Sequence, residues 1–372
     1  MFFSPIFSKE FSQADVRMLA LFAVFWLALA HPSLGSEHID ELLKKHPTWS
    51  FEVESVDTFI NKALHEHSFG GQNLEETEKD LREEVKRSLA PGATHIVRKI
   101  GDPKWETDPS KVPSFFDARE RWPACAPLIG FVEDEGNCWT DTPAVISSVL
   151  SDRYCIFTNG TWKERFSQEI LLGCAELCTG NAWQFFSWDY AKTRGIPTGG
   201  THGSGKGCVP YTLPGCDHTP WYKTEGLDRK NVSPCKDVIF DHDCPKTCTN
   251  SKYKTPIDKD RIHTTTFYFM SRSEFFIRNE IMNYGPVMAR INFFDDFLEK
   301  PDGIWEEKPG RQRIGWLKYF KVIGWGAENG IKYWLCVHTW DTWGDKIFKF
   351  PRGENLDGVE NLASCAVFED LD

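Results

Sequence analysis

All twelve cysteines of this 372-residue chain lie at or beyond Cys125, and the first third of the chain has none. In an exported protein, cysteines gathered in one region are typical of a disulfide framework, which narrows the folds open to that region. The Cys-x3-Cys spacings at 174–178 and 244–248 would also fit a zinc site. We favour disulfides because the N-terminal region has the features of export into an oxidising compartment.

An apolar run of 13 residues near the N-terminus, at 18–30, has the sequence MLALFAVFWLALA. It is shorter than the roughly 20 residues that cross a bilayer as a helix, and it is typical of the core of a signal peptide. The acidic residues before it are unusual in a signal peptide, which makes Met18 an alternative start. We assign 1–35 to a signal peptide, with an uncleaved anchor as the alternative, and expect no membrane span in the mature chain.

Residues 36–110 form a cysteine-free, charge-rich segment. HIDELLKKH at 38–46 and LEETEKDLREEVKRSLAPG at 74–92 are expected to be helices, and the second ends at a Pro-Gly stop. A linker, GDPKWETDPSKVP, follows at 101–113. The segment 36–110 is therefore expected to be a small helical, propeptide-like region with its linker, placed before a larger domain at 111–372.

The larger domain is expected to be α+β. PAVISSVLSDR at 143–153 has apolar residues at helical spacing on one face: Val145, Ile146, Val149 and Leu150. Strands are expected at 264–270, 319–326, 332–340 and 345–350. Helices first and strands second predict a domain with two halves.

The net charge and the glycosylation sequons restrict the classes of protein to which this chain could belong. A formal net charge of −11 argues against a nucleic-acid binder, which would usually carry a basic face. N-glycosylation sequons begin at Asn159 and Asn231, and the second is weakened by the Pro234 that follows it. We expect an extracellular or lysosomal protein that travels through the secretory pathway.

The larger domain resembles cathepsin B-like members of the papain family of cysteine proteases over about 112–370. The motifs that carry the resemblance stand in the family's order: VPSFFDARERWPAC at 112–125, SDRYCIFTNG at 151–160, GCVPYTLPGC at 207–216, GPV at 285–287, VIGWGAENGIKYWL at 322–335 and WGDKIFKFPRG at 343–353. IDELLKKHPTW at 39–49 is similar to the family's short propeptide. The resemblance implies a papain-like two-lobed fold, with a helical left half, a β-rich right half and a substrate cleft between them.

The resemblance also implies five disulfides, namely Cys125–Cys155, Cys138–Cys178, Cys174–Cys244, Cys208–Cys248 and Cys216–Cys235. Cys336 and Cys365 match no pair of the family. They are expected to be buried thiols or a bridge of their own.

The nucleophile of a papain-like protease is a thiolate at the start of the central helix, where the helix dipole and an imidazolium lower its pKa. The family pattern Gln-Gly-Ser-Cys-Gly-Ser-Cys-Trp precedes a helix that ends in Ser-Asp-Arg. When the family pattern is aligned at 151–153 and extended toward the N-terminus without a gap, its nucleophile position falls on Asp141. Cys138 then falls on the upstream cysteine that forms a disulfide.

The alternative register makes Cys138 and Trp139 the catalytic pair. It moves three residues from the loop into the helix, which would rotate the apolar face by about 60°. It also leaves Cys178 without its partner. The alternative function is therefore an active cysteine-type peptidase that uses Cys138.

The other catalytic positions also differ from the family. Lys318 stands where the base His is expected, His338 where the orienting Asn is expected, and Glu135 where the oxyanion Gln is expected. An ionised Glu135 cannot donate a hydrogen bond to an oxyanion. We therefore expect an inactive homologue of a cysteine endopeptidase, with no catalytic residue, cofactor or metal.

Two explanations of Asp141 remain open. It precedes Pro143, a good first-turn residue, so Asp141 could cap the helix or favour its dipole. Alternatively, Asp141 and Lys318 form an ion pair, within about 6 Å, that preserves the family's thiolate–imidazolium charge pattern. His338 is expected to be a partly exposed polar residue.

The resemblance places five residues in the cleft: Gly136, Gly180, His218, Trp340 and Leu362. The backbone at 178–180 would bind an extended peptide, Leu362 replaces a carboxylate that accepts basic side chains, and His218 remains from a His pair that blocks one end. We expect a peptide or protein ligand in this vestigial cleft, with active relatives or matrix proteins as possible partners. A hydrolase of another type, using Asp141 and His338, is a further alternative.

Overall fold

A computed structural model describes residues 51–54, 95–98, 108–138, 140–176, 178, 184–218, 233–235, 242–270, 273–298, 303–341 and 346–368. Several expected features lie outside these residues, namely the signal peptide, the helices at 38–46 and 74–92, Gly180 and the sequon at Asn231. In the described part of the segment expected to be helical, β1 (Phe51–Glu54) pairs with β2 (His95–Arg98) in an antiparallel ladder that was not predicted.

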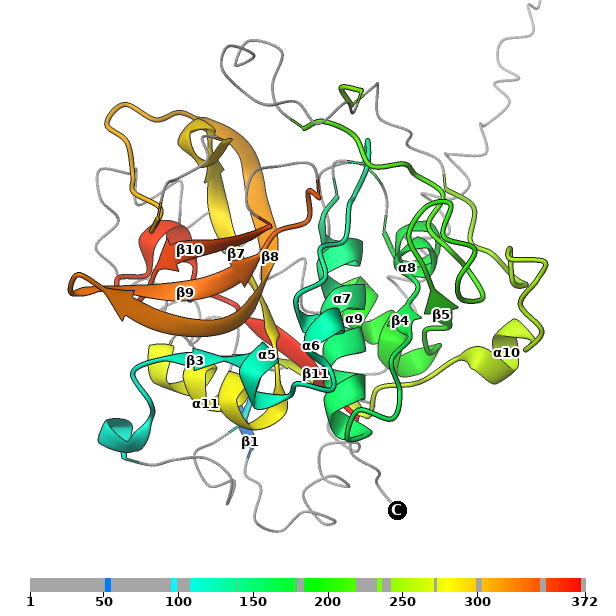
Figure 1. The fold of residues 1–372 in the computed structure, drawn as a ribbon, viewed down its shortest axis with the longest axis horizontal. Coiled ribbons are helices and arrows are strands. Elements are labelled where there is room, and N and C mark those ends of the chain that lie inside the picture. The colour runs from blue at the N-terminus through cyan, green and yellow to red at the C-terminus, as the bar shows by residue number, and fades with distance from the viewer. Residues whose placement is uncertain are drawn as a thin grey trace, which may run out of the picture.

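The helix α7 (Thr142–Phe157) is the centre of the fold, as Figure 1 shows. The four predicted apolar residues are buried, and so are polar residues on the other faces, because α7 packs against helices on one side and strands on the other. Ser151 shows how the polar faces are satisfied. Its hydroxyl donates to the Ser147 carbonyl at 2.6 Å and accepts from the Phe166 amide at 2.9 Å.

The helical half, in teal to yellow-green in Figure 1, contains α7 and the shorter helices. Ser167 caps the N-terminus of α8 by accepting from the Ile170 amide at 3.1 Å, a typical N-cap contact. Besides α7, the described helices of this half are α5 (Ala118–Arg121), α6 (Ala126–Ile129), α8 (Gln168–Cys174), α9 (Gln184–Thr193) and α10 (Ile257–Asp260), of which α6, α8 and α9 contact α7. The two-residue strands β4 (Arg165–Phe166) and β5 (Thr198–Gly199) pair beside them.

The β half is an antiparallel sheet with the order β10-β9-β8-β7-β11-β6, and β3 (Phe116–Asp117) pairs with one end of β8. The strands are β6 (Thr266–Phe269), β7 (Val287–Phe294), β8 (Arg313–Glu328), β9 (Ile331–Val337), β10 (Ile347–Pro351) and β11 (Ser364–Val367). The four expected strands are confirmed as β6, β8, β9 and β10. The strands β7 and β11 and the helix α11 (Glu274–Tyr284) were not predicted.

All five disulfides implied by the resemblance are present. The zinc alternative for the Cys-x3-Cys spacings is wrong, because each of those cysteines is disulfide-bonded. Cys336 and Cys365 are buried thiols, so they form no bridge of their own. Burial alone raises the pKa of the Cys336 thiol well above its ordinary value, which keeps it protonated.

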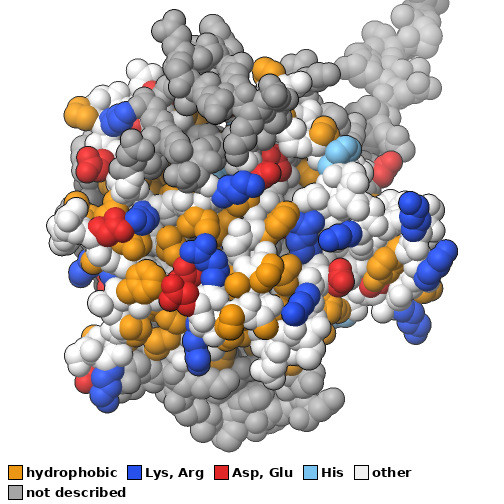
Figure 2. Space-filling model, in the orientation of Figure 1, with side chains coloured by type: hydrophobic (Ala, Val, Ile, Leu, Met, Phe, Trp, Pro, Cys, Tyr) orange, Lys and Arg blue, Asp and Glu red, His pale blue; other side chains and the backbone are white. Residues whose placement is uncertain are grey.

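The surface mixes charged and apolar side chains. On the face shown in Figure 2, basic and acidic groups are interspersed with apolar ones over the described residues. The large apolar side chains with the greatest exposure are Phe115, Phe157, Phe186, Ile314 and Ile331. No helix among the described residues is long and apolar enough to cross a membrane.

Buried charges join α7 to the β half. Lys321 of β8 places Nζ 2.7 Å from Asp152 Oδ2 and donates to the Ser148 hydroxyl at 2.7 Å. Arg153 pairs with Glu280 of α11, and its Nη1 also donates to the Pro286 carbonyl at 3.1 Å. Breaking one partner of such a pair would leave a buried charge uncompensated, which typically costs about 3–5 kcal/mol.

The burial of Asp152 predicts a specific pH dependence of stability. Burial raises the pKa of Asp152 from 3.8 to about 6, against the opposing effect of the Lys321 ammonium. Because the folded chain holds this proton more tightly than the unfolded chain, the stabilisation is present at low pH and is lost as the pH rises from about 4 to about 6. The loss is about 3 kcal/mol over that window. In the variant Asp152→Asn, this pH-dependent loss of stability should be absent.

Urea unfolding with the disulfides intact, at several pH values between about 4 and 7, measures this effect. The free energy of unfolding of the natural chain, minus that of the variant, should fall with rising pH. Asp258→Asn, at an exposed position of α10, is the matched control for the removal of one carboxylate. Parallel profiles for the natural chain and Asp152→Asn would show that Asp152 does not titrate in this range.

Candidate functional site

The site lies where the start of α7 meets β8 and the end of β9, and Lys318 is at its centre. Lys318 Nζ is 3.1 Å from Asp141 Oδ2 and 3.3 Å from both carboxylate oxygens of Glu135. It also donates to the Thr339 hydroxyl at 3.0 Å. All four side chains are buried. One ammonium group is therefore held between two carboxylates and a hydroxyl, away from solvent.

Asp141 joins the two halves of the molecule. It is the N-cap residue of α7, as its position before Pro143 predicts, but its carboxylate makes no capping hydrogen bond to the helix. Instead, Oδ2 accepts from the backbone amide of Tyr319 at 2.8 Å and contacts Lys318. The expected ion pair with Lys318 is therefore present, while the carboxylate still lies at the positive end of the helix dipole.

Glu135 completes the charge cluster. Its carboxylate accepts from the Lys318 ammonium, from the Thr339 hydroxyl at 3.2 Å and from the indole N–H of Trp340. Burial raises the pKa of the Glu135 carboxyl, and the nearby Asp141 carboxylate adds to the rise, whereas Lys318 opposes it. The pKa of the Glu135 carboxyl thus depends on the charges of Asp141 and Lys318, and a change at either residue would alter it.

The expectation that His338 is partly exposed is wrong, since only 2% of it is exposed. The rings of Phe297, Trp340 and Phe348 surround it, with centroids 5.7, 4.6 and 5.6 Å away. Its Nδ1 accepts from the amides of Thr339 and Trp340 at 2.9 and 3.1 Å, which places the proton of the neutral ring on Nε2. Burial lowers the pKa of His338 well below its ordinary value, and the positive charge of Lys318 adds to this.

Trp340 links the cluster to His218. The Lys318 ammonium lies 3.9 Å from the centroid of the Trp340 ring, a cation–π contact. The His218 ring stacks on Trp340 at 4.9 Å with 12° between the planes. The resemblance placed both residues in the cleft, and the structure brings them into direct contact.

Cys138 is not a free thiol. Its sulfur is bonded to Cys178, and only 1% of the residue is exposed. The next residue in the chain, Trp139, lies outside the described residues. A sulfur in a disulfide carries no thiolate and cannot attack a carbonyl.

Gly136 and Leu362, which were both expected in the cleft, have different structural roles. Gly136 has φ of +59°, and a Cβ there would approach the Pro214 carbonyl oxygen to 2.8 Å, so the loop before α7 requires glycine at this position. Leu362, which the resemblance placed in the cleft, is 2% exposed and packs in the core cluster that contains the apolar face of α7. It presents no surface to a ligand in this structure.

Sequence reasoning missed two members of the site. The Thr339 hydroxyl bridges Lys318 and Glu135, and the Tyr319 amide binds Asp141. The signal for Thr339 was its place in His-Thr-Trp, where the family has Asn-Ser-Trp and thus also a hydroxyl. No signal in the sequence points to a backbone amide.

The chemistry open to this cluster is limited. It holds carboxylates that accept hydrogen bonds, an ammonium that donates them and a hydroxyl already bonded on both sides. A cavity of about 10 Å³ adjoins the cluster at Thr339, and eight residues line it: Glu133, Ala144, Val145, Ser148, Lys321, Val337, His338 and Thr339. Such a space is of the size of one water molecule. The arrangement therefore favours a closed structural contact over a reaction centre.

A comparison with known families matches this domain. The sequence profile described as "Papain family cysteine protease" matches residues 112–367, which is more than half of the chain. The matched region contains every described residue of the charge cluster.

Two curated relatives and one solved structure agree with that match. The chain is 28% identical over 332 residues to the "Cathepsin B-like cysteine proteinase" of Schistosoma japonicum, covering 88% of this chain and 89% of that protein. It is 30% identical over 266 residues to "Cathepsin B-like cysteine proteinase 4" of Caenorhabditis elegans, covering 69% and 76%. The structure "proCathepsin B S9 from Trypanosoma congolense" has a TM-score of 0.59 at 27% identity, covering 73% and 82%. The chain therefore belongs to the papain family of cysteine proteases, as a cathepsin B-like member.

Proposed function

We propose that this cathepsin B-like chain is a pseudoprotease, which binds a peptide or protein and does not cleave it. The observation that carries the proposal is the state of Asp141 and Cys138. The residue at the nucleophile position is a carboxylate in an ion pair with Lys318, and the nearest cysteine in the chain is bonded to Cys178. Neither side chain can act as a nucleophilic thiolate.

The ungapped register supports this assignment of positions. It requires Cys138 to be the upstream cysteine, whose partner in the family's pattern corresponds to Cys178, and the two sulfurs are bonded. It also requires the residue at the nucleophile position to lie beside the residue at the base position. Asp141 Oδ2 and Lys318 Nζ, at 3.1 Å, satisfy that requirement.

The charge pattern explains how both positions could change without loss of the fold. A papain-like protease holds a thiolate and an imidazolium here, which are an anion and a cation in contact. Asp141 and Lys318 retain an anion on α7 and a cation on β8. The electrostatic contact between the two halves is kept, whereas the nucleophile and the base are absent.

The proposed ligand is a peptide or protein in the vestigial cleft, with active relatives or matrix proteins as candidate partners. Backbone groups near Cys178 would bind an extended peptide in a β-like manner. We propose an extracellular or lysosomal location, with 1–35 as signal peptide and glycosylation at Asn159 and Asn231. Asn159 suits this role because it is exposed in the turn after α7, where φ is +51°. The segment 36–110 could remain attached, since there is no active cleft for it to restrain.

An epoxide that alkylates papain-like thiols should not label the natural chain, and mass spectrometry of tryptic peptides measures this. Loss of a catalytic nucleophile alone costs on the order of 10⁶ in turnover, so cleavage of peptide substrates should also be undetectable. The variant E135Q/D141C/K318H/H338N should be labelled at position 141 and should cleave peptides.

The matched control is E135Q/K318H/H338N, which retains Asp141 and should stay unlabelled. Labelling of Cys138 in the natural chain would favour the active peptidase with the shifted register. A quadruple variant that folds, as judged by its near-ultraviolet circular dichroism, but takes up no epoxide would contradict the assignment of the four positions.

Lys318→Met tests whether the charge cluster is a structural contact. The substitution leaves the carboxylates of Glu135 and Asp141 buried without their cation, and this should lower the free energy of unfolding by about 3–5 kcal/mol. The triple variant E135Q/D141N/K318M removes all three charges and should recover most of that loss. Urea unfolding at neutral pH measures both variants.

Lys349→Met is the matched control, because Lys349 forms a more exposed ion pair with Glu328, 2.5 Å from Nζ to Oε1. Its loss should cost no more than about 1 kcal/mol. If Lys318→Met is as mild as Lys349→Met, the cluster does not hold the two halves together. If the triple variant is no more stable than Lys318→Met, the cost comes from packing and not from unpaired charge.

A further inference from the structure

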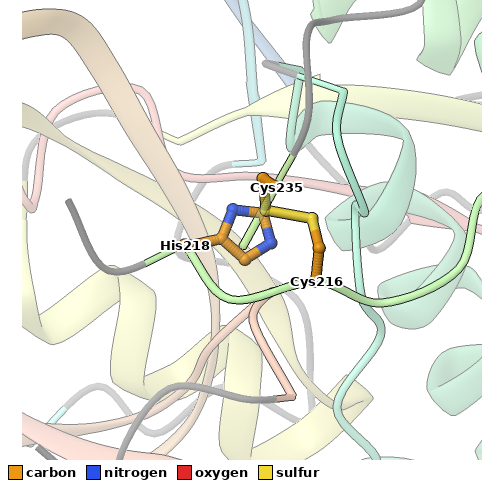
Figure 3. Close-up of side chains that lie close together, drawn as sticks. All are labelled: Cys216, His218 and Cys235. Atoms are coloured by element: carbon orange, nitrogen blue, oxygen red, sulfur yellow. A yellow bond between two sulfur atoms is a disulfide. The ribbon is translucent and has the colours of Figure 1, made fainter. Parts of the chain in front are cut away.

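The disulfide Cys216–Cys235 lies beside His218, as Figure 3 shows. The two sulfurs and one ring nitrogen of His218 all lie within 4.8 Å of one another. Among the residues that the structure describes, this is the one group of three or more metal-ligating side chains this close. We propose that reduction of Cys216–Cys235 converts this group into a zinc site with two thiolates and one imidazole.

The backbone holds the two cysteines together independently of their disulfide. Asp217 forms a parallel bridge with Pro234, in which the Asp217 amide donates to the Ser233 carbonyl at 2.9 Å. The Cys235 amide donates to the Asp217 carbonyl at 3.1 Å. These bonds flank the sulfurs and do not involve them, so the two thiols of the reduced form remain neighbours.

The His218 ring is already oriented by two contacts. It stacks on Trp340 at 4.9 Å, and its Nε2 lies 3.5 Å from Asp134 Oδ1. The Asp134 carboxylate is itself fixed by the amides of Gly136 at 2.8 Å and Asp341 at 3.1 Å. A carboxylate beside a ligating histidine is the usual second partner in zinc sites, where it fixes the tautomer and raises the basicity of the ring.

The chemistry balances with a small thiol of the glutathione class as reductant. Two such thiols give up two electrons and form their own disulfide, while the bond between the sulfurs of Cys216 and Cys235 breaks and each sulfur takes up a proton. Zn²⁺ then displaces the two thiol protons and binds both sulfurs and one ring nitrogen of His218. A water molecule completes the tetrahedral coordination, as in zinc sites with three protein ligands.

This disulfide is suited to open before the buried ones. Cys216 is 8% exposed and Cys235 is half-buried, whereas the sulfurs of Cys125–Cys155 and Cys138–Cys178 lie in the core. It closes the shortest loop of the five, with a separation of 19 residues, and a short loop gives the least stabilisation through the unfolded chain. Cys174–Cys244 is more exposed, and Cys208–Cys248 also has one half-buried cysteine, but the group of metal-ligating side chains includes neither disulfide.

The experiment is a metal titration of the full chain, oxidised or reduced with a phosphine and desalted under argon. The phosphine concentration is chosen so that the near-ultraviolet circular dichroism is unchanged. The reduced chain should bind one Zn²⁺, measured by competition with a chromogenic chelator, and Co²⁺ in its place should show thiolate charge-transfer absorption. The oxidised chain should bind none.

Variants separate this site from the more exposed disulfide Cys174–Cys244. His218→Phe preserves a ring against Trp340 and should weaken zinc binding by more than about tenfold, and C216S/C235S should abolish it. The matched control C174S/C244S should bind as the natural chain does. The proposal is overturned if zinc binding survives C216S/C235S, is unchanged in His218→Phe or is lost in C174S/C244S. The proposal also fails if the near-ultraviolet circular dichroism signal disappears before the disulfide Cys216–Cys235 is reduced.

Discussion

The fold depends on buried ion pairs between α7 and the β half. Asp141 contacts Lys318 and Asp152 contacts Lys321, and both lysines lie on β8. The two aspartates are 11 residues apart, which is about three turns, so they project from the same side of α7. Ion pairs of this kind add little net stability compared with apolar residues, yet losing one partner is costly. The interface between the two halves therefore tolerates joint substitution of a pair far better than substitution of one member.

This constraint relates the scaffold of a protease to the proposed loss of its chemistry. Where α7 meets β8, one anion and one cation neutralise each other's charge. A thiolate with an imidazolium meets this requirement, and so does Asp141 with Lys318. Thr339 and Trp340 add donors to Glu135, so a carboxylate can also be buried there. Membership of the papain family thus fixes the positions of these side chains, whereas activity depends on which side chains occupy them.

The sequence predicted what local pattern and family resemblance determine. The spacing of Val145, Ile146, Val149 and Leu150 predicted α7, and the ungapped register offered the contact between Asp141 and Lys318 as one of two explanations of Asp141. Burial was harder, because it depends on residues distant in the chain. His338 was expected to be partly exposed, but Phe297 and Phe348 cover it from other parts of the β half. The register could not show that Leu362 turns into the core, where φ is +54°.

Trp340 connects the charge cluster to the proposed zinc site. One face of its ring stacks on His218, its indole N–H donates to Glu135, and the Lys318 ammonium contacts its ring. A metal that fixes His218 would restrict Trp340 and favour one arrangement of the cluster, and the cluster would favour the same His218 orientation. Coupling between two sites is reciprocal in free energy. Any peptide whose binding moves Trp340 would therefore change the affinity of the reduced chain for zinc, and zinc would change the affinity for that peptide by the same factor.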